Sequence, residues 1–268
     1  MSADTLRARG FHDWLVAECL PDPVLGVATV ALTHRASLDR CSTYLAALRE
    51  AVRRFPPPFG TDAYAQLYRE ASELGEWLAV SLMTNAEREG DGATRLWSLA
   101  ACCPDAEERR LLKRHAVDES HHALAYLSLL DRCFPDAMSS EFHAQLRTLS
   151  PHYAMSQDVV AVEGSPYARQ PTVDDYVQMN IAEIRTAIHH TMQRGALTRH
   201  AHPESMSGIT KILDAILVDE LNHVGYSAEL IQQKVSSLPP DALAELVARR
   251  LQDFSQITRD ELGTLVFD

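Results

Sequence analysis

The stretch V-D-E-S-H-H at 117–122 returns in altered form as V-D-E-L-N-H at 218–223, so V-D-E-x-x-H occurs twice, roughly a hundred residues apart. A glutamate and a histidine three positions apart lie on the same side of an α-helix, where a carboxylate oxygen and a ring nitrogen can bind one metal ion. A chain of this composition is expected to contain about one E-x-x-H by chance, but two that both follow an aspartate are improbable by chance. The repeat therefore predicts two similar helical hairpins, each of which supplies half of one site.

The composition is that of a globular chain with a sizeable core. Of 268 residues, 46% are hydrophobic and 23% are charged. The 25 basic residues are outnumbered by 37 acidic ones, which gives a net charge of −12. Because phosphate groups are bound by clustered Lys and Arg, this charge argues against nucleic acid or an anionic membrane as the partner.

Three further features bear on location. No apolar run approaches the ~20 residues needed to cross a bilayer, and the stretch MSADTLRARG at 1–10 has no apolar segment of the kind a signal peptide needs. The cysteines form an odd set without a C-x-x-C pair, which suits a reducing compartment and argues against disulfides and thiolate zinc sites. We therefore expect a cytoplasmic protein with no membrane segment. The five cysteines are Cys19, Cys41, Cys102, Cys103 and Cys133.

Apolar residues recur with the 3.6-residue period of amphipathic helices along nearly the whole chain, and strand patterns are almost absent. The glycines at 90 and 92 predict a kink or an interruption, and 149–171 is expected to be irregular. We expect a single helical domain, 1–268. The predicted helices span 3–19, 24–54, 61–101, 105–132, 172–196, 205–236 and 240–254, with a shorter one near 138–148.

The face on which each acid lies distinguishes metal ligands from ordinary surface charges. At about 100° per residue, Glu119 and His122 fall in the middle of an apolar stripe, whereas His121 points the other way. Glu220 and His223 occupy the same place on the second helix. A buried carboxylate costs several kcal/mol unless it is paired or bound to metal, so this placement favours metal ligands over solvated surface groups. The stripes run Leu112, His115, Glu119, His122, Tyr126, Leu130 and Leu213, Ile216, Glu220, His223, Ser227, Ile231.

Two more carboxylates are expected from the helices that precede these pairs. On 61–101, Glu89 lies on the apolar stripe, while folding the hairpin about its connection mildly favours Glu87. The face argument leads us to choose Glu89. On 172–196 the choice is simpler, because Glu183 is the only acid in the middle of the segment.

Four further residues have two interpretations each. Asp118 and Asp219 either accept the ring N–H of a ligand histidine or are solvated surface acids. His115, four residues before Glu119 on the same stripe, is either a third histidine ligand or a buried structural histidine. His190, two turns beyond the carboxylate of its helix, is a weaker candidate. We include His115 among the predicted ligands and assign Asp118 and Asp219 the supporting role.

The predicted ligands form a hard, anionic set. Four carboxylates with two or three imidazoles suit Fe(II), Fe(III) or Mn(II) better than a structural zinc ion. Four negative charges balance two divalent ions, so the site without metal is expected to be less stable than the loaded site.

The order Glu89, D-E-x-x-H at 118–122, Glu183 and D-E-x-x-H at 219–223 resembles the ferritin-like diiron carboxylate superfamily over roughly 61–236. The resemblance implies an all-α fold, namely a four-helix bundle with additional N- and C-terminal helices. It also implies two iron ions, with O2 as co-substrate. The bridging ligands would be Glu119 and Glu220, and the terminal carboxylates would be Glu89 and Glu183.

Within this superfamily the chain is most similar in style to the diiron N-oxygenases of the p-aminobenzoate N-oxygenase type. Those proteins have an extra histidine one turn before the second E-x-x-H pair, where this chain has Ile216. Here His115 precedes the first pair instead. At this position the chain departs from the N-oxygenase pattern.

The resemblance implies an O2-dependent oxygenase that acts on a small molecule by N-oxygenation or C–H oxidation. Since the chain has no flavin or iron–sulfur motif, an external reductase or ferredoxin is expected to supply electrons. We also expect a homodimer. Three alternatives stay open, namely iron oxidation and storage, hydroxylation of a tRNA base, and a non-catalytic helical scaffold. The extra helices argue against a minimal cage subunit, and the net charge of −12 argues against tRNA.

Overall fold

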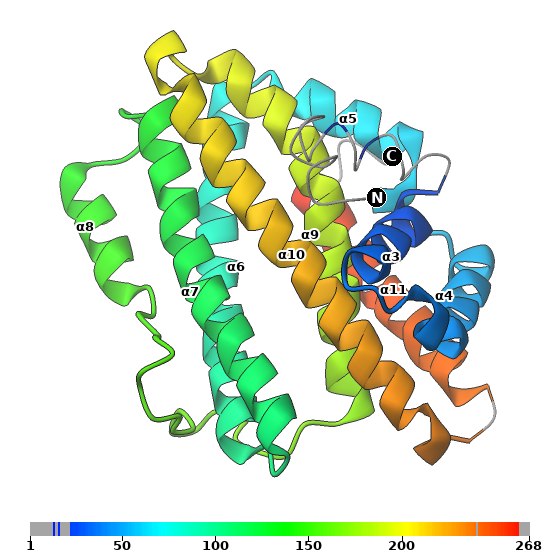
Figure 1. Cartoon of the computed structure of the whole chain (residues 1–268). Coiled ribbons are helices and arrows are strands. Elements are labelled where there is room, and N and C mark those ends of the chain that lie inside the picture. Colours follow the sequence, from blue (N-terminus) through cyan, green and yellow to red (C-terminus); the bar gives the residue numbers. More distant parts are fainter. Residues whose placement is uncertain (1–12, 14–15, 17–21, 240, 263–268) are drawn as a thin grey trace. The chain divides into compact units, whose positions relative to one another are not determined.

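A computed structural model describes residues 13, 16, 22–239 and 241–262 of the chain (Figure 1). The described residues are mostly helical and contain no strand, so the predicted all-α class is confirmed. None of the helices among them is long and apolar enough to cross a bilayer. The predicted helix 3–19 lies outside the described residues, apart from positions 13 and 16.

Contacts between residues divide the chain into two compact units, so the single domain 1–268 stays a prediction. Two long helices, α9 (Val173–His200) and α10 (Met206–Lys234), contribute residues to both units. Each unit is described by itself below. Unit 1 comprises the chain up to Ala71, Val173–Ala196 and the chain from Leu213 onward, and unit 2 comprises Ser72–Thr172 and Leu197–Ile212.

Unit 2 is built on the antiparallel pair α6 (Gly75–Cys102) and α7 (Ala106–Cys133), which pack along their lengths (Figure 1). The connection between them is short: it runs over 103–105, and its last residue is the N-cap of α7. The side chain of Asp105 is that cap, and it accepts from two backbone N–H groups of the first turn at 2.9 and 2.8 Å. The shorter α8 (Ser140–Leu149) contacts α7.

The segment predicted as one helix over 61–101 is two helices, because α5 (Asp62–Ser72) ends before α6 begins. The interruption expected at Gly90 and Gly92 does not occur, since α6 continues through both. A glycine in a helix costs roughly 1 kcal/mol relative to alanine, and the packing of α6 along α7 offsets that cost. Three other predictions agree with the structure, namely 105–132 with α7, 138–148 with α8, and the irregular 149–171.

The single helix predicted over 24–54 is also wrong. The chain turns at Ala36, whose φ of 52° lies in the left-handed region. At this turn Arg35 pairs with Glu229 of α10 at 2.7 Å, and the pair holds the break in place. The helices of unit 1 are α3 (Pro23–His34), α4 (Ser42–Arg54), α5, α11 (Ala242–Leu262) and most of α9 and α10, with 3-10 turns at Leu38–Cys41, Pro58–Gly60 and Val235–Ser237.

Within unit 1, α9 and α10 lie antiparallel. Nδ2 of Asn180 donates to the carbonyl oxygen of Val224 at 2.9 Å, while Arg194 pairs with Asp214. Higher residue numbers on α9 thus meet lower numbers on α10. The predicted helix 205–236 agrees with α10 and its flanking 3-10 turns, whereas α9 and α11 run one to two turns past the predicted ends of 172–196 and 240–254.

Candidate metal centre

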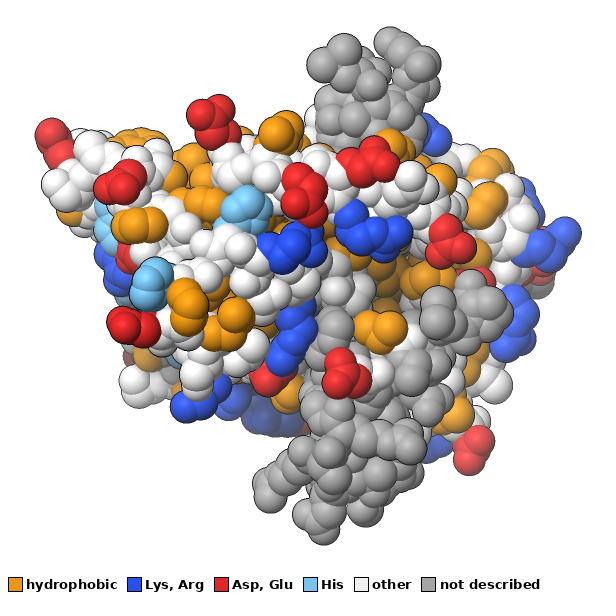
Figure 2. Space-filling model, turned by 90° about the horizontal axis from the view of Figure 1, so that it is seen from above, with side chains coloured by type: hydrophobic (Ala, Val, Ile, Leu, Met, Phe, Trp, Pro, Cys, Tyr) orange, Lys and Arg blue, Asp and Glu red, His pale blue; other side chains and the backbone are white. Residues whose placement is uncertain are grey.

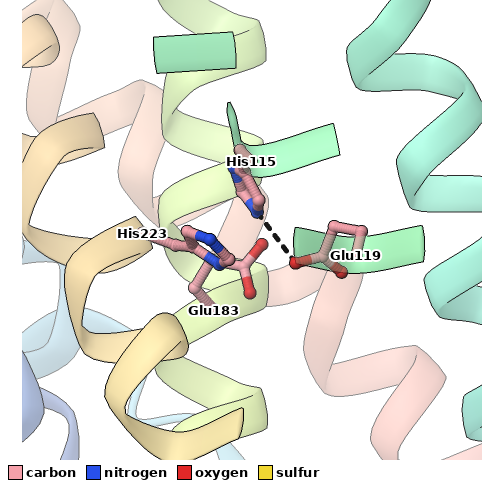
Figure 3. Close-up of side chains that lie close together, drawn as sticks. All are labelled: His115, Glu119, Glu183 and His223. Carbon is pink, nitrogen blue, oxygen red and sulfur yellow. Dashed lines mark ion pairs between the residues drawn. The ribbon is translucent and has the colours of Figure 1, made fainter. Parts of the chain in front are cut away.

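His115, Glu119 and His122 lie on one face of α7, the apolar face that the sequence predicts. Nε2 of His115 is 3.1 Å from Oε1 of Glu119, and Nδ1 of His122 is 3.5 Å from the same oxygen. Figure 3 shows the His115–Glu119 ion pair as a dashed line. The three residues are 0%, 4% and 2% exposed. Three groups that bind metals therefore converge on one buried point of α7.

The preceding helix, α6, supplies a fourth side chain to this cluster, Glu89. One ligand atom from each of Glu89, Glu119 and His122 lies within 4.8 Å of the other two. Ligands held at 2.0–2.2 Å around one ion are at most about 4.4 Å apart, so a small adjustment would let the three share an ion. The alternative carboxylate, Glu87, is exposed. The geometry thus favours Glu89, as the face argument does.

The carboxyl group of Glu119 lies in an unusual electrostatic environment. Burial raises the pKa of Glu119, but hydrogen bonds from Glu89 and the two histidines outweigh burial and lower this pKa well below its ordinary value. A hydrogen bond between two carboxyl groups requires a proton on one of them. A divalent cation would replace that proton and neutralise both carboxylates, so the donor set fits a metal ion.

The residues that flank the motif glutamates and histidines in sequence differ in their surroundings. Asp118 accepts from Nε of Arg114 with both carboxylate oxygens, each at 3.1 Å. Asp219, on α10, is half-buried, and His121 is exposed on the opposite face, as predicted. The expected role of the two aspartates as acceptors for ligand histidines stays a prediction.

Unit 1 carries a second cluster, on α9 and α10. Glu183, Glu220 and His223 are 8%, 0% and 2% exposed. Nδ1 of His223 is 3.8 Å from Oε2 of Glu220, and ligand atoms of Glu183 and His223 lie within 4.8 Å of each other. Figure 3 includes Glu183 and His223. Unit 1 therefore repeats the chemistry of the α7 cluster, with two carboxylates and one imidazole.

A buried polar network lies one turn from this second cluster. The hydroxyl of Tyr44 on α4 donates to Oδ1 of Asn180 at 2.7 Å, and Nδ2 of Asn180 donates to Oγ of Ser227 at 2.9 Å. Oγ of Ser227 donates to the carbonyl oxygen of His223 at 2.6 Å. Burial raises the pKa of Tyr44, so its hydroxyl keeps the proton that it donates. The network fixes the position of α10 against α9 and α4 next to His223.

Sequence reasoning missed Tyr44 and Asn180. Asn180 precedes Glu183 by three positions and so shares its face of α9, and an amide on that apolar face was the available signal. His190 is buried, but it belongs to neither group of potential metal ligands among the described residues. Tyr126 is buried, as expected of a core residue.

The two clusters can do the same kind of chemistry. Each offers two carboxylates and at least one imidazole from helices, and all of these side chains are buried except that of Glu89, which is half-buried. Hard oxygen ligands with imidazole suit iron or manganese. Comparison of the chain with protein-family models, with curated proteins and with solved structures found no match. The function is therefore argued from these residues.

Proposed function

We propose that the chain is a non-heme diiron oxygenase that uses O2 to oxidise a small organic molecule. In this proposal α6, α7, α9 and α10 form a four-helix bundle of ferritin-like type, with α3, α4 and α11 as additions. The α6–α7 cluster and the α9–α10 cluster then act as two halves of one centre. The bundle and the joining of the halves belong to the proposal.

The observation that carries the proposal is the crowding of acids in a dry environment. Glu89 and Glu119 approach each other beside two buried histidines, although isolated buried carboxylates cost several kcal/mol. Glu220 is fully buried on the other pair of helices. Bound cations explain why such groups are placed in an interior, because they neutralise the carboxylates that would otherwise repel each other.

The proposed ligands divide between two metal positions that share Glu119. One position would take two ligands from each cluster, and the other would take three from the α6–α7 cluster and one from the α9–α10 cluster. One position would use His115, Glu119, Glu183 and His223, the residues drawn in Figure 3, and the other would use Glu89, Glu119, His122 and Glu220.

Iron bound there would supply the one-electron chemistry that O2 reduction needs, and an external reductase or ferredoxin would supply the electrons. The protein's own part is to hold the ligands and exclude water. Helix-borne side chains keep their spacing, and the buried neighbours Leu112 and Tyr126 line the same face of α7. Asp118 and Asp219 would orient the ligand histidines by accepting their ring N–H.

A small-molecule substrate also fits the surface. On the face drawn in Figure 2, acidic and basic side chains are interspersed with apolar ones. With a net charge of −12 for the chain, the protein is poorly suited to tRNA, which is bound through basic patches. We also propose that the protein works as a homodimer, which size measurement in solution would test.

Iron binding tests the proposal most directly. After anaerobic addition of Fe(II) and removal of unbound metal, the wild-type chain should retain close to two irons, measured by plasma mass spectrometry. Glu119→Gln should lose both irons, since its carboxylate is assigned to both positions. Glu87→Gln is the matched control, because it removes an exposed acid from α6 and should keep two irons.

Two results would contradict the proposal: iron near zero in the folded wild type, or two irons in Glu119→Gln. Circular dichroism of each variant shows whether it is folded. A second measurement tests the redox part. The reduced, iron-loaded wild type should consume O2, and Glu119→Gln treated in the same way should not exceed the rate of free Fe(II).

A further inference from the structure

Unit 2 contains a pocket of about 500 Å³, which is within the usual size range of small-molecule sites. It lies where α6 ends and α7 begins, and the irregular segment after α8 forms its opposite wall. No lining residue is a proposed metal ligand. Lys113 precedes His115 by two residues on α7, which places the two side chains about 200° apart around the helix. The lining residues are Ala101, Ala106, Arg109, Arg110, Lys113, Met155, Asp158 and Val159.

The wall formed by the irregular segment is held in place by specific contacts. Nζ of Lys113 donates to the carbonyl oxygens of Met155 and Gln157 at 2.8 and 2.5 Å. The ring of Tyr153 stacks on that of Trp97, with centroids 4.3 Å apart and an angle of 4° between the planes. These contacts attach the segment to both helices, so the pocket is a built feature of the fold.

The charge of the lining is positive, in contrast to the chain as a whole. The guanidinium of Arg109 donates two hydrogen bonds to the carbonyl oxygen of Cys103, at 3.0 and 2.7 Å. Carbonyl oxygens also hold Lys113, and a carbonyl carries no formal charge that could cancel that of a cation. Arg110 is paired with Glu107 at 2.6 Å. Among the lining residues, Asp158 is the one acid against three cations.

The remaining lining is apolar. Ala101 and Ala106 contribute small side chains from the two helices, and Met155 and Val159 contribute larger ones from the segment. Methionine adapts its shape to varied ligands. A ligand that satisfies the whole lining would place a negative group between Arg109 and Lys113 and rest an apolar body against these four side chains.

We propose that this pocket binds a small organic anion with an apolar body, of the class of aromatic or aliphatic carboxylates. Arg109 and Lys113, which donate to uncharged carbonyl oxygens, face Asp158 alone and give the pocket its preference for an anion. The apolar lining excludes a fully hydrated inorganic ion as the best ligand. The inference goes beyond the proposed metal centre and does not depend on it, because no lining residue is an assigned metal ligand.

Calorimetric titration of the full chain with 2-naphthoate tests the inference, with 2-naphthamide as a neutral probe of the same shape. Naphthoate should bind saturably and at least tenfold more tightly than naphthamide. Arg109→Gln should weaken naphthoate binding about fivefold. Asp158→Asn should tighten it about threefold, because it removes the opposing charge. A gain in affinity cannot result from misfolding.

The matched control is Arg95→Gln, which removes a positive charge from α6 outside the lining and should change the affinity less than twofold. Naphthoate binding should also weaken as salt is added. The inference would be overturned by equal binding of the two probes, by no binding at millimolar naphthoate, or by an affinity that Asp158→Asn leaves unchanged.

Discussion

The cluster on α6 and α7 and the cluster on α9 and α10 share the E-x-x-H spacing but differ in what surrounds it. One turn before Glu119 the first cluster has His115, 3.1 Å from the carboxylate. At the same position before Glu220 the second cluster has Ile216, a buried core residue. The first cluster therefore has four potential ligands and the second has three.

The second cluster has instead the stronger structural support. Tyr44 reaches it from α4 through Asn180 and Ser227. Arg35, just after α3, pairs with Glu229, which follows His223 by six residues on α10. The same sequence motif is thus accompanied by an additional potential ligand in the first cluster and by additional hydrogen bonds that hold its helix in the second. Equivalent substitutions should therefore have different effects in the two clusters. The two proposed metal positions should also differ in affinity, because one takes two histidines and the other takes one.

The largest expected difference comes from the paired positions His115 and Ile216. His115→Ala removes a proposed ligand, so anaerobic Fe(II) titration should show one of two irons lost or bound at least tenfold more weakly. Ile216→Ala leaves every ligand and creates a cavity, so it should keep two irons and lose about 2–4 kcal/mol of unfolding free energy. His121→Ala, at an exposed position, is the control for both. Equal iron loss in the two variants would contradict this difference between the clusters.

One glycine near each cluster allows the stability effect of an added methyl group to be compared between them. A Cβ at Gly225 on α10 would lie 2.2 Å from Cδ of Arg35 and 3.2 Å from the carbonyl oxygen of Ala31. Gly225→Ala should therefore displace Arg35 and cost about 1–3 kcal/mol in urea unfolding. A Cβ at Gly92 on α6 would lie 3.8 Å from Oε2 of Glu119, an ordinary contact. Gly92→Ala should be neutral or stabilise by up to about 1 kcal/mol, through helix propensity.

The outcome for Gly92 also bears on the metal. Because the space beside Glu119 accepts a methyl group, Gly92→Ala should retain two irons, whereas the longer side chain in Gly92→Leu should reduce iron loading. If both variants load iron normally, the space next to Glu119 is not used by a metal or its ligands.

The network behind the second cluster leads to a smaller prediction. Tyr44→Phe removes the donor to Oδ1 of Asn180 and leaves a buried acceptor, which should cost about 1–3 kcal/mol of unfolding free energy. A double-mutant cycle with Ser227→Ala measures whether the two hydroxyls act together. A coupling energy near zero would show that Tyr44 supports α9 alone.

Much of the candidate site could be predicted because its signal is local. Glu119 and His122 lie on a continuous helix, so a constant turn per residue was enough to place them inside and His121 outside. The choice of Glu89 over Glu87 followed from the same argument. Where the sequence analysis failed, the cause was a contact between distant segments. The break after α3 depends on Arg35 and Glu229, which are 194 residues apart, and local periodicity carries no signal of that pair.

The polar network around Asn180 also depends on contacts between distant segments, which local periodicity does not indicate. Ser227 is a member of the predicted stripe on α10, and Asn180 shares the face of Glu183 on α9. Their role becomes visible only through the hydrogen bonds that connect them with Tyr44. The continuity of α6 through two glycines has a similar cause, because helix propensity is a weak local term that packing along α7 overrides. In this chain the burial and grouping of the candidate ligands could be predicted from periodicity. The hydrogen bonds that support them could not.

The smallest expected effect concerns pH and the ion pair that ends α3. Burial raises the pKa of Glu229, but the hydrogen bonds from Arg35 and Ser37 and the charges of Arg35 and Arg40 together outweigh burial and lower this pKa below its ordinary value. The stabilisation is therefore present above the unfolded-state pKa of about 4.3 and is lost as pH falls through the lower folded-state pKa. In urea unfolding at pH 7, the unfolding free energy of the wild type should exceed that of Glu229→Gln by about 1 kcal/mol. This difference should shrink towards zero near pH 3. A stability difference that did not change with pH would mean that Arg35 and Glu229 stabilise the protein by packing and not by charge. The Gly225→Ala variant, which displaces Arg35, would then measure the same packing contribution.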